Sequence, residues 1–371
     1  MEGFRSERPE ETLEFIESTG IDRELGLKPV SERGEGDAHV VVFRNGKGKH
    51  HAGKGTSKTQ ARVSGVMEAV ERDRCRYDES RVIRDPDDPV NPYPEAYRGE
   101  PNRWVDALTL PDGEHVQIPV EEVFHPVPEA IAPTHTNGLA AGRTRNEAIV
   151  QGLLEVIERD AWSVHEERRA PVEQLDVTGT DVEKVVDSVE AVTGYRPNLR
   201  LLPSRVEGVH VVGAVLDTGD PDTTVMGMGA SPIPEMAAVR AVLESLQGFE
   251  LNRLGIESPV RKTMSPELRD ILEEKLTPER FRRMNAHWFK TSETVHIDDL
   301  ERKNFDDVES LLNWLVDRTC EGLGGPVLVA DLPDRFEGVH VVRVRVIGAL
   351  ETAVDGVRGR RGTRRALEQV V

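Results

Sequence analysis

The sequence predicts an α+β fold, in which helices and strands mix along the chain without strict alternation. Helical and strand-like patterns both recur from the first quarter of the chain to the last. Two strand-like runs, Val105–Leu110 and Val116–Val120, are joined by Pro111-Asp112-Gly113 and predict an antiparallel hairpin. Such a hairpin favours α+β over a purely parallel sheet. An acidic helical pattern also occurs twice, around Glu68 and around Glu155.

The expected elements follow in order from the N-terminus. Pro9 and the acidic residues after it predict a short helix that ends at a turn around Gly20. Apolar and β-branched runs predict strands at His39–Phe43, Val105–Leu110, Val116–Val120, His210–Leu216, Thr224–Met228, Val327–Leu332 and Val339–Ile347. Apolar residues at helical spacing predict helices at Thr59–Tyr77, Arg145–His165, Val182–Val192, Met236–Asn252, Pro266–Leu276 and Val308–Cys320.

The chain divides into an N-terminal segment of residues 1–52, a main body of residues 53–350 and a basic tail of residues 351–371. Residues 261–300 are highly charged and contain few strand formers, which predicts an inserted helical lobe or a mobile cover. The tail is expected to be a solvated or disordered end, or a contact for an anion or a partner. Its arginines are Arg358, Arg360, Arg361, Arg364 and Arg365.

The formal charge of −19, from 67 acidic and 48 basic residues, argues against a surface built to bind nucleic acid or anionic lipid. A local cluster of arginines or a metal ion could still reverse the sign in one cleft. The only cysteines, Cys75 and Cys320, exclude a disulfide framework and are expected to be small core residues. No segment approaches the roughly 20 apolar residues of a membrane span, so we expect a cytoplasmic protein.

The acidic helix belongs to an internal repeat. Gly55–Asp73 aligns on Gly142–Asp160 without a gap, with eight identities in nineteen positions, which indicates a duplication. The identical pairs are Gly55/Gly142, Ala61/Ala148, Val63/Val150, Gly65/Gly152, Glu68/Glu155, Glu71/Glu158, Arg72/Arg159 and Asp73/Asp160. A weaker third copy has Ala237 and Glu244 at the same seven-residue spacing, with Gln247 where the second glutamate would be.

In each acidic helix, glutamates at positions i and i+3 project from one face, with an arginine beside them. Most other positions are apolar, so we expect the carboxylates to turn inward, where they need a cation. Carboxylates are the hard ligands that Mg²⁺ prefers, usually together with phosphates. The repeat therefore predicts a magnesium-nucleotide site. The alternative, surface ion pairs from Glu68 to Arg72 and from Glu155 to Arg159, explains one helix more easily than two matched copies.

The segment Gly48–Gly55 nearly matches the phosphate-binding loop Gly-x-x-x-x-Gly-Lys-Ser/Thr, but Gly55 lacks the hydroxyl required at the last position. We expect a Gly/Lys turn after a strand, from which Lys54 could still reach a phosphate. His50 and His51 are expected in a surface turn rather than as a metal pair.

Two segments carry a resemblance to a known family. Ser64–Arg72 fits the motif Ser-x-x-x-Glu-x-x-Glu-Arg of the YcaO family, and Asn137–Gly142 with Glu155–Arg159 resembles the second signature of that family. The resemblance extends to Gly53-Lys54-Gly55, the helix with Glu244 and Gln247, and the late strand Val339–Ile347. It implies that residues 53–350 form a YcaO-like catalytic domain, with duplicated strand-helix units around a magnesium-nucleotide cleft.

The resemblance implies ATP and Mg²⁺ as cofactors and assigns roles where residues match the family motifs. Glu68, Glu71, Glu155 and Glu158 would be magnesium ligands. The nucleotide would be surrounded by Ser64, Arg72, Asn137, Arg159 and Gln247. Lys54 is added from its loop, and Glu244, which could join either group, is placed with the nucleotide.

Members of this family phosphorylate a peptide-backbone amide oxygen with ATP and make azolines, amidines or thioamides. Azoline-forming members have a proline-rich C-terminus, which Arg364–Val371 lacks. The resemblance therefore favours thioamide formation on a peptide or protein, with sulfide or a carrier as sulfur donor. In methanogenic archaea a glycine of methyl-coenzyme M reductase is modified in this way, with help from a TfuA-type partner, and a homodimer is implied. The alternatives are an azoline-forming cyclodehydratase and a non-catalytic nucleotide-binding accessory protein.

Overall fold

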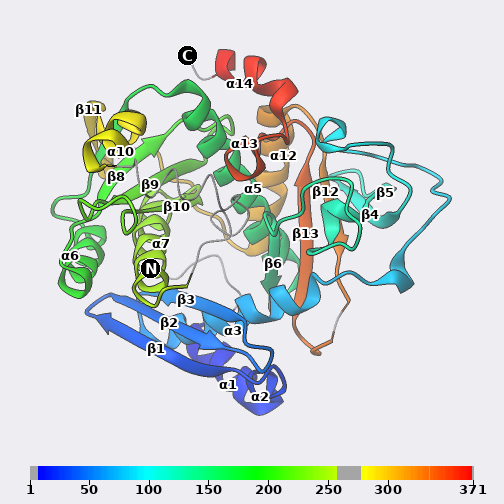
Figure 1. Cartoon of the computed structure of the whole chain (residues 1–371), viewed down its shortest axis with the longest axis horizontal. Helices are drawn as coiled ribbons and strands as arrows, with labels where there is room; N and C mark the ends of the chain where they lie inside the picture. The colour runs from blue at the N-terminus through cyan, green and yellow to red at the C-terminus, as the bar shows by residue number, and fades with distance from the viewer. Residues whose placement is uncertain (1–6, 257–276, 334, 370–371) are drawn as a thin grey trace.

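The computed structural model describes residues 7–256, 277–333 and 335–369, and within them helices surround three β-sheets (Figure 1). This mixture confirms the predicted α+β class. The helix predicted at Pro266–Leu276 lies outside the described residues. No helix in the described ranges combines the length and apolarity needed to cross a membrane.

The N-terminal part forms an antiparallel sheet in the order β1-β2-β3. Its elements are α1 (Pro9–Thr19), α2 (Ile21–Glu24), β1 (Lys28–Glu35), β2 (Ala38–Arg44), β3 (His50–Gly55) and α3 (Lys58–Arg74). The central strand β2 is buried on both faces, because successive side chains point to opposite sides of a sheet. Val41 and Phe43 pack in the cluster that includes α3, whereas Ala38 and Val40 pack against helices from the middle of the chain.

The middle of the chain forms a five-stranded sheet in the order β10-β9-β8-β7-β11, antiparallel except where β11 pairs with β7. Its elements are β7 (Val172–Asp176), α6 (Asp181–Thr193), β8 (Asn198–Leu202), β9 (His210–Leu216), β10 (Val225–Ser231), α7 (Pro234–Arg253), α10 (Pro278–Met284), α11 (Ala286–Phe289) and β11 (Thr291–His296). Helix α7 lies between this sheet and the N-terminal sheet (Figure 1).

The third sheet, in the order β5-β4-β12-β13-β6, is antiparallel throughout. Its strands β4 and β5 confirm the predicted hairpin. The elements of this region are η1 (Glu79–Arg81), η2 (Pro94–Ala96), β4 (Trp104–Leu110), β5 (His115–Pro119), α4 (Val120–Val123), β6 (Leu139–Gly142), α5 (Arg145–Arg168), η3 (Ile297–Asp299), α12 (Val308–Leu323), β12 (Val327–Asp331) and β13 (His340–Val346).

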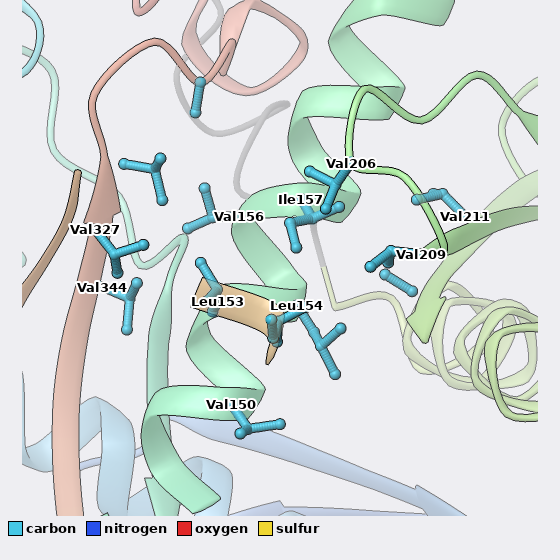
Figure 2. Packing of buried hydrophobic residues seen from close by; sticks show 14 of the residues in the cluster. Val150, Leu153, Leu154, Val156, Ile157, Val206, Val209, Val211, Val327 and Val344 are labelled. Atoms are coloured by element: carbon cyan, nitrogen blue, oxygen red, sulfur yellow. The ribbon is translucent and has the colours of Figure 1, made fainter. Parts of the chain in front are cut away.

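Helix α5 runs through the centre of the largest apolar cluster (Figure 2). On one side Leu153 packs towards Val344 of β13, and on the other Ile157 packs towards Val206 and Val209. Between Glu147 and His165 nearly every face of α5 is buried, because its apolar residues occur on several faces of the helix. These apolar residues suit its central position.

Each predicted strand coincides with an observed one, whereas β1, β3, β6, β7, β8 and β11 were not predicted. The missed strands are short, or contain glycine and charged residues that lower strand propensity. Pairing with a neighbouring strand, which local sequence does not reveal, stabilises them.

The prediction of a helical lobe at residues 261–300 is wrong for the C-terminal end of this segment. The described part of this segment contains the short helices α10 and α11, but Thr291–His296 forms strand β11. Val295 pairs with Leu175 of β7 in a parallel register. The β-branched Thr291, Thr294 and Val295 suit a strand once that partner is in place.

The prediction of a solvated or disordered C-terminal tail is wrong for Arg358. This side chain is fully buried, and its Nη2 lies 2.8 Å from Glu122 Oε1 on α4. Asp355 is a second ion-pair partner of Arg358. Arg360 and Arg361 are exposed, as expected. The tail contains α13 (Thr352–Asp355), η4 (Arg360–Gly362) and α14 (Thr363–Gln369).

Candidate active site

Three strand-helix units, β3–α3, β6–α5 and β10–α7, bring their acidic helices to the centre of the molecule (Figure 1). A two-residue connection joins strand to helix in each unit. Ser57 and Thr144 cap α3 and α5 by accepting hydrogen bonds from backbone N–H groups of the first turn, and Pro234 starts α7. Local sequence therefore determines where each helix begins.

Glycines let the helices lie directly on their strands. A Cβ atom at Gly53 would lie 2.0 Å from the carbonyl oxygen of Ala61, and a Cβ atom at Gly229 would lie 2.2 Å from that of Ala237. These matching contacts show that β10–α7 repeats the packing of β3–α3. They place Glu244 in the register of the first glutamate of the acidic motif.

The carboxylates of α3 are bound by the backbone of neighbouring strands. Glu68 Oε2 accepts a hydrogen bond from Ala52 N at 2.8 Å, and Glu71 Oε1 accepts one from Ala141 N at 2.9 Å. Burial and the nearby Glu68 and Glu155 carboxylates nevertheless raise the pKa of Glu71 to about 8. Glu71 therefore ionises at neutral pH only when a cation offsets its charge.

The carboxylates of α5 share one arginine. Arg159 Nη1 lies 2.7 Å from Glu158 Oε1, and its Nη2 lies 3.7 Å from Glu155 Oε1. Burial raises the pKa of both glutamates, that of Glu158 to about 7, because Arg159 offsets the loss of hydration only in part. This second pair of carboxylates is also short of positive charge.

Helix α7 completes the cluster. Glu244 Oε2 lies 2.8 Å from Lys54 Nζ, and its Oε1 lies 3.9 Å from Arg159 Nη2. Burial acts to raise the pKa of Glu244, but Lys54 and Arg159 lower it overall. Gln247 Nε2 donates to the carbonyl oxygen of Ala52, the residue whose N–H binds α3. Helices α3 and α7 thus meet at β3, and Arg159 connects α5 to α7.

These oxygen donors fit Mg²⁺ that is bound together with phosphate. Burial is the main cause of the raised pKa values of Glu71 and Glu158, and the neighbouring basic residues replace the lost hydration of the charged forms only in part. Among the described residues, no group of three or more His, Cys, Asp or Glu side chains is placed to hold a metal ion alone. Mg²⁺ commonly takes one or two carboxylates and completes its shell with phosphates and water. An open set of donors of this kind suits a metal that arrives with a nucleotide.

The remaining predicted residues lie in two places. Ser64 is half-buried on α3, one turn before Glu68. Arg72 Nη2 lies 3.6 Å from Glu68 Oε1, and its Nη1 donates to Thr136 Oγ1. Asn137, next to Thr136, contacts a different group, because its Nδ2 donates to Glu351 Oε1 at 2.6 Å. Arg72 therefore links the acidic cluster to the loop that contains Asn137.

Behind that loop lies a buried ionic network that sequence reasoning missed. Arg345 lies 3.1 Å from both Glu351 and Glu122, and all three side chains are fully buried. Arg343, also fully buried, donates from Nη2 to the carbonyl oxygen of His135, and burial beside Arg345 lowers its pKa to about 9. The signal was present, since both arginines interrupt the apolar run of the predicted strand at β13.

Two predictions about β3 are corrected. Lys54 lies in a strand rather than in a glycine-rich turn, because β3 pairs with β2 through the whole of Arg44–His39. His51 is buried rather than in a surface turn; its Nε2 lies 3.0 Å from Asn45 Nδ2, and burial lowers its pKa. Cys75 is buried, as predicted.

Repeated strand-helix units with inward acidic helices define the class of this site as an oxygen-rich one, suited to a metal ion bound with phosphate. A family model described as YcaO cyclodehydratase, ATP- and Mg²⁺-binding, matches residues 52–350, and this chain belongs to the YcaO family. The predicted cofactors, ATP and Mg²⁺, are those of the family.

Individual relatives agree with this assignment. The structure of YcaO from Methanopyrus kandleri bound with AMPPCP and Mg²⁺ is 45% identical, with a TM-score of 0.85 over 96% of this chain and 95% of that one. An uncharacterized protein from Methanothermobacter thermautotrophicus is 35% identical over 94% of this chain and 91% of its own length. An uncharacterized protein in the tfuA 3′ region of Rhizobium leguminosarum bv. trifolii is 27% identical over 58% of this chain and 57% of its own. A heterocyclase in complex with substrate and cofactor, 20% identical, shares the fold with a TM-score of 0.76 over 94% of this chain and 53% of that one.

Proposed function

We propose that this chain uses ATP and Mg²⁺ to activate a backbone amide of a peptide or protein and converts the amide to a thioamide with an external sulfur donor. The observation that carries the proposal is the cluster of carboxylates on α3, α5 and α7, in which the pKa values of Glu71 and Glu158 are raised to about 8 and about 7. Such a cluster lacks positive charge until a metal ion enters it. The AMPPCP and Mg²⁺ bound to the relative from Methanopyrus kandleri support the same ligands here.

In the proposed site, Glu68, Glu71, Glu155 and Glu158 would be ligands of Mg²⁺ ions, with one or two carboxylates on each ion and phosphates and water completing its shell. When bound, Mg²⁺ neutralises phosphate charge and so favours phosphoryl transfer. Lys54 and Arg159, which both lie beside Glu244, supply fixed positive charge for the phosphates. The nucleotide contacts are Lys54, Ser64, Arg72, Asn137, Arg159, Glu244 and Gln247.

The proposed reaction balances with hydrosulfide as the sulfur donor. Sulfur adds to the carbonyl carbon, so that a C–S bond forms and the carbonyl electrons move to oxygen. That oxygen attacks the γ-phosphorus of ATP, and the bond to the β-phosphate breaks to release ADP. Loss of the S–H proton to water and departure of phosphate then break the C–O bond and form C=S. Phosphorylation is required because the oxygen of an amide is otherwise a poor leaving group.

Three further features belong to the proposal. The product of the proposed reaction is a thioamide, and an azoline is the alternative product. The relative in the tfuA 3′ region supports a TfuA-type partner, and the relatives from Methanopyrus and Methanothermobacter support an archaeal target such as a glycine of methyl-coenzyme M reductase. We also propose a cytoplasmic homodimer.

Mass spectrometry tests the product. The protein is incubated with ATP, Mg²⁺, sulfide and a synthetic peptide of the target region, and one exchange of oxygen for sulfur is expected. Loss of water from a peptide that contains Cys, Ser or Thr would instead identify a cyclodehydratase. Binding of nucleotide without any change in peptide mass would identify an accessory protein.

Calorimetry tests the site. The variants Glu71→Gln and Glu158→Gln are expected to lose Mg²⁺-dependent binding of AMPPCP, because each removes a charged oxygen ligand. Glu167→Gln, at an exposed position of α5, is the matched control and should bind normally. Unchanged binding in both cluster variants would refute the assignment of metal ligands.

A further inference from the structure

Between Glu147 and Glu166, helix α5 has a single accessible stripe. Every residue of Glu147–His165 is buried except those in one row along the helix, and Glu166 extends that row by one turn. The stripe consists of Gln151, Glu155, Arg159, Trp162 and Glu166. Residues three and four positions apart lie on the same face of a helix, so the stripe is continuous. Accessible surface therefore leads from the acidic cluster along α5 to Glu166.

The far end of the stripe contains a carboxylate held by three donors. Glu166 accepts hydrogen bonds from Trp288 Nε1 at 2.7 Å and Trp162 Nε1 at 3.2 Å, and its Oε2 lies 3.0 Å from His287 Nε2. Burial acts to raise its pKa, but the bonds from His287 and Trp288 outweigh burial and lower the pKa to about 2. Glu166 is thus ionised and fixed in place, while 29% of its side chain stays exposed.

Among the ion pairs of the described residues, none joins Glu166 to an arginine or a lysine. Among the described residues its ion-pair partner is His287, and two of its three donors are neutral indole groups. The carboxylates of Glu158 and Glu244, in contrast, each contact an arginine or a lysine. Glu166 therefore presents negative charge to the accessible stripe.

The surroundings of this carboxylate are rigid. Trp288 is completely buried, and a Cβ atom at Gly213 would lie 2.6 Å from its ring, so the indole fits only against glycine. The ring of His165 packs edge-on against Trp288 at 4.6 Å. The Arg159 guanidinium lies over the Trp162 ring, 5.5 Å from its centre, so this ring already contacts one basic side chain. An aromatic wall and a fixed carboxylate together form a preformed site for a long basic side chain.

We propose that Trp162 and Glu166 bind a lysine or arginine side chain of the peptide substrate. The proposal rests on the function given above and names a feature of its substrate. Glu166 follows Glu158 by eight residues, which is about 12 Å along the helix axis. An extended peptide covers that length with about three to four residues. The basic residue therefore lies about three to four positions from the amide that reacts.

Fluorescence anisotropy tests this recognition without turnover. The labelled peptides are alanine-rich and have one central glycine. Each peptide carries a single lysine at one of the six positions before or after the glycine, and a matched peptide carries glutamate at the same position. Binding is measured with Mg²⁺ and AMPPCP. The wild-type protein should bind peptides with lysine three or four positions from the glycine ~10-fold more tightly than peptides with glutamate there, as expected for a charge-assisted hydrogen bond. Glu166→Gln should abolish this preference, and Glu167→Gln should retain it.

Equal binding of all peptides by the wild-type protein would overturn the proposal, and so would a lysine preference that survives in Glu166→Gln. If that variant fails to fold, the wild-type peptide series decides alone. The two proposals fail separately. A lysine preference without exchange of oxygen for sulfur contradicts only the thioamide reaction, and exchange without any lysine preference contradicts only the recognition site.

Discussion

Replacing Glu71 by glutamine should stabilise the ligand-free protein while it destroys metal binding. The pKa of Glu71 is about 8 in the folded chain against an ordinary value of 4.5. A carboxyl whose pKa is higher in the folded chain than in the unfolded chain lowers the free energy of unfolding as pH rises from the unfolded pKa to the folded pKa. The unfolded chain loses its proton first, so ionisation favours unfolding. At pH 7 the raised pKa of Glu71 lowers the free energy of unfolding by about 3 kcal/mol, and the partial exposure of its side chain reduces this loss to about 1–3 kcal/mol.

Thermal unfolding between pH 5 and pH 8 measures this effect. For 371 residues, about 1 kcal/mol corresponds to about 1.3 °C, so Glu71→Gln should raise Tm at pH 7 by about 1–4 °C. The difference from wild type should shrink towards pH 5. Glutamine can still accept the hydrogen bond from Ala141 N, so the substitution isolates the charge. Adding Mg²⁺ and AMPPCP should stabilise only the wild type. A variant less stable than wild type at pH 8, or one with the same pH slope, would refute the reasoning.

Two further substitutions test the packing. Arg358→Met leaves Glu122 buried with one ion-pair partner fewer, and it should lower the free energy of unfolding in urea by about 3–5 kcal/mol. The control Arg361→Met, at an exposed position, should lower it by less than about 0.5 kcal/mol. Equal effects of the two substitutions would contradict the buried pair. Gly229→Ala forces α7 away from β10 and should cost about 1–3 kcal/mol or more, while Gly46→Ala, which meets nothing within 4 Å, should be nearly neutral; an equally mild Gly229→Ala would disprove the close helix-strand contact.

Local sequence predicted the helices of the repeat well. The spacing from Ala61 to Glu68 recurs in α5 and α7, and each helix begins where a cap or a proline occurs. These features act within a few residues, so they are readable without the fold. Strand β11 was missed for the opposite reason, because the β7 strand that pairs with it lies more than 100 residues away.

The sequence names the acidic residues of the candidate site, but it does not reveal their environment. The sequence indicates that Glu71 and Glu158 face inward, yet their raised pKa values depend on which arginines reach them. Asn137 illustrates the limit, since its amide contacts Glu351 rather than a carboxylate of the repeat. The sequence shows Arg343 and Arg345 within a valine-rich strand, and a charged residue at such a position predicts a buried partner of opposite charge.

The sequence by itself determined that acidic helices recur on glycine-containing strands, because glycine spacing, caps and apolar periodicity are local properties of the chain. Only the tertiary structure decided that α3 and α7 meet at β3 with Arg159 of α5 beside Glu244, that Arg358 closes a buried network with Glu122, and that one stripe of α5 stays accessible. Contacts between residues that are distant in the sequence determine how far each carboxylate is buried and which charges lie beside it. Burial and neighbouring charges in turn determine whether a glutamate forms a surface ion pair or needs a cation to be ionised.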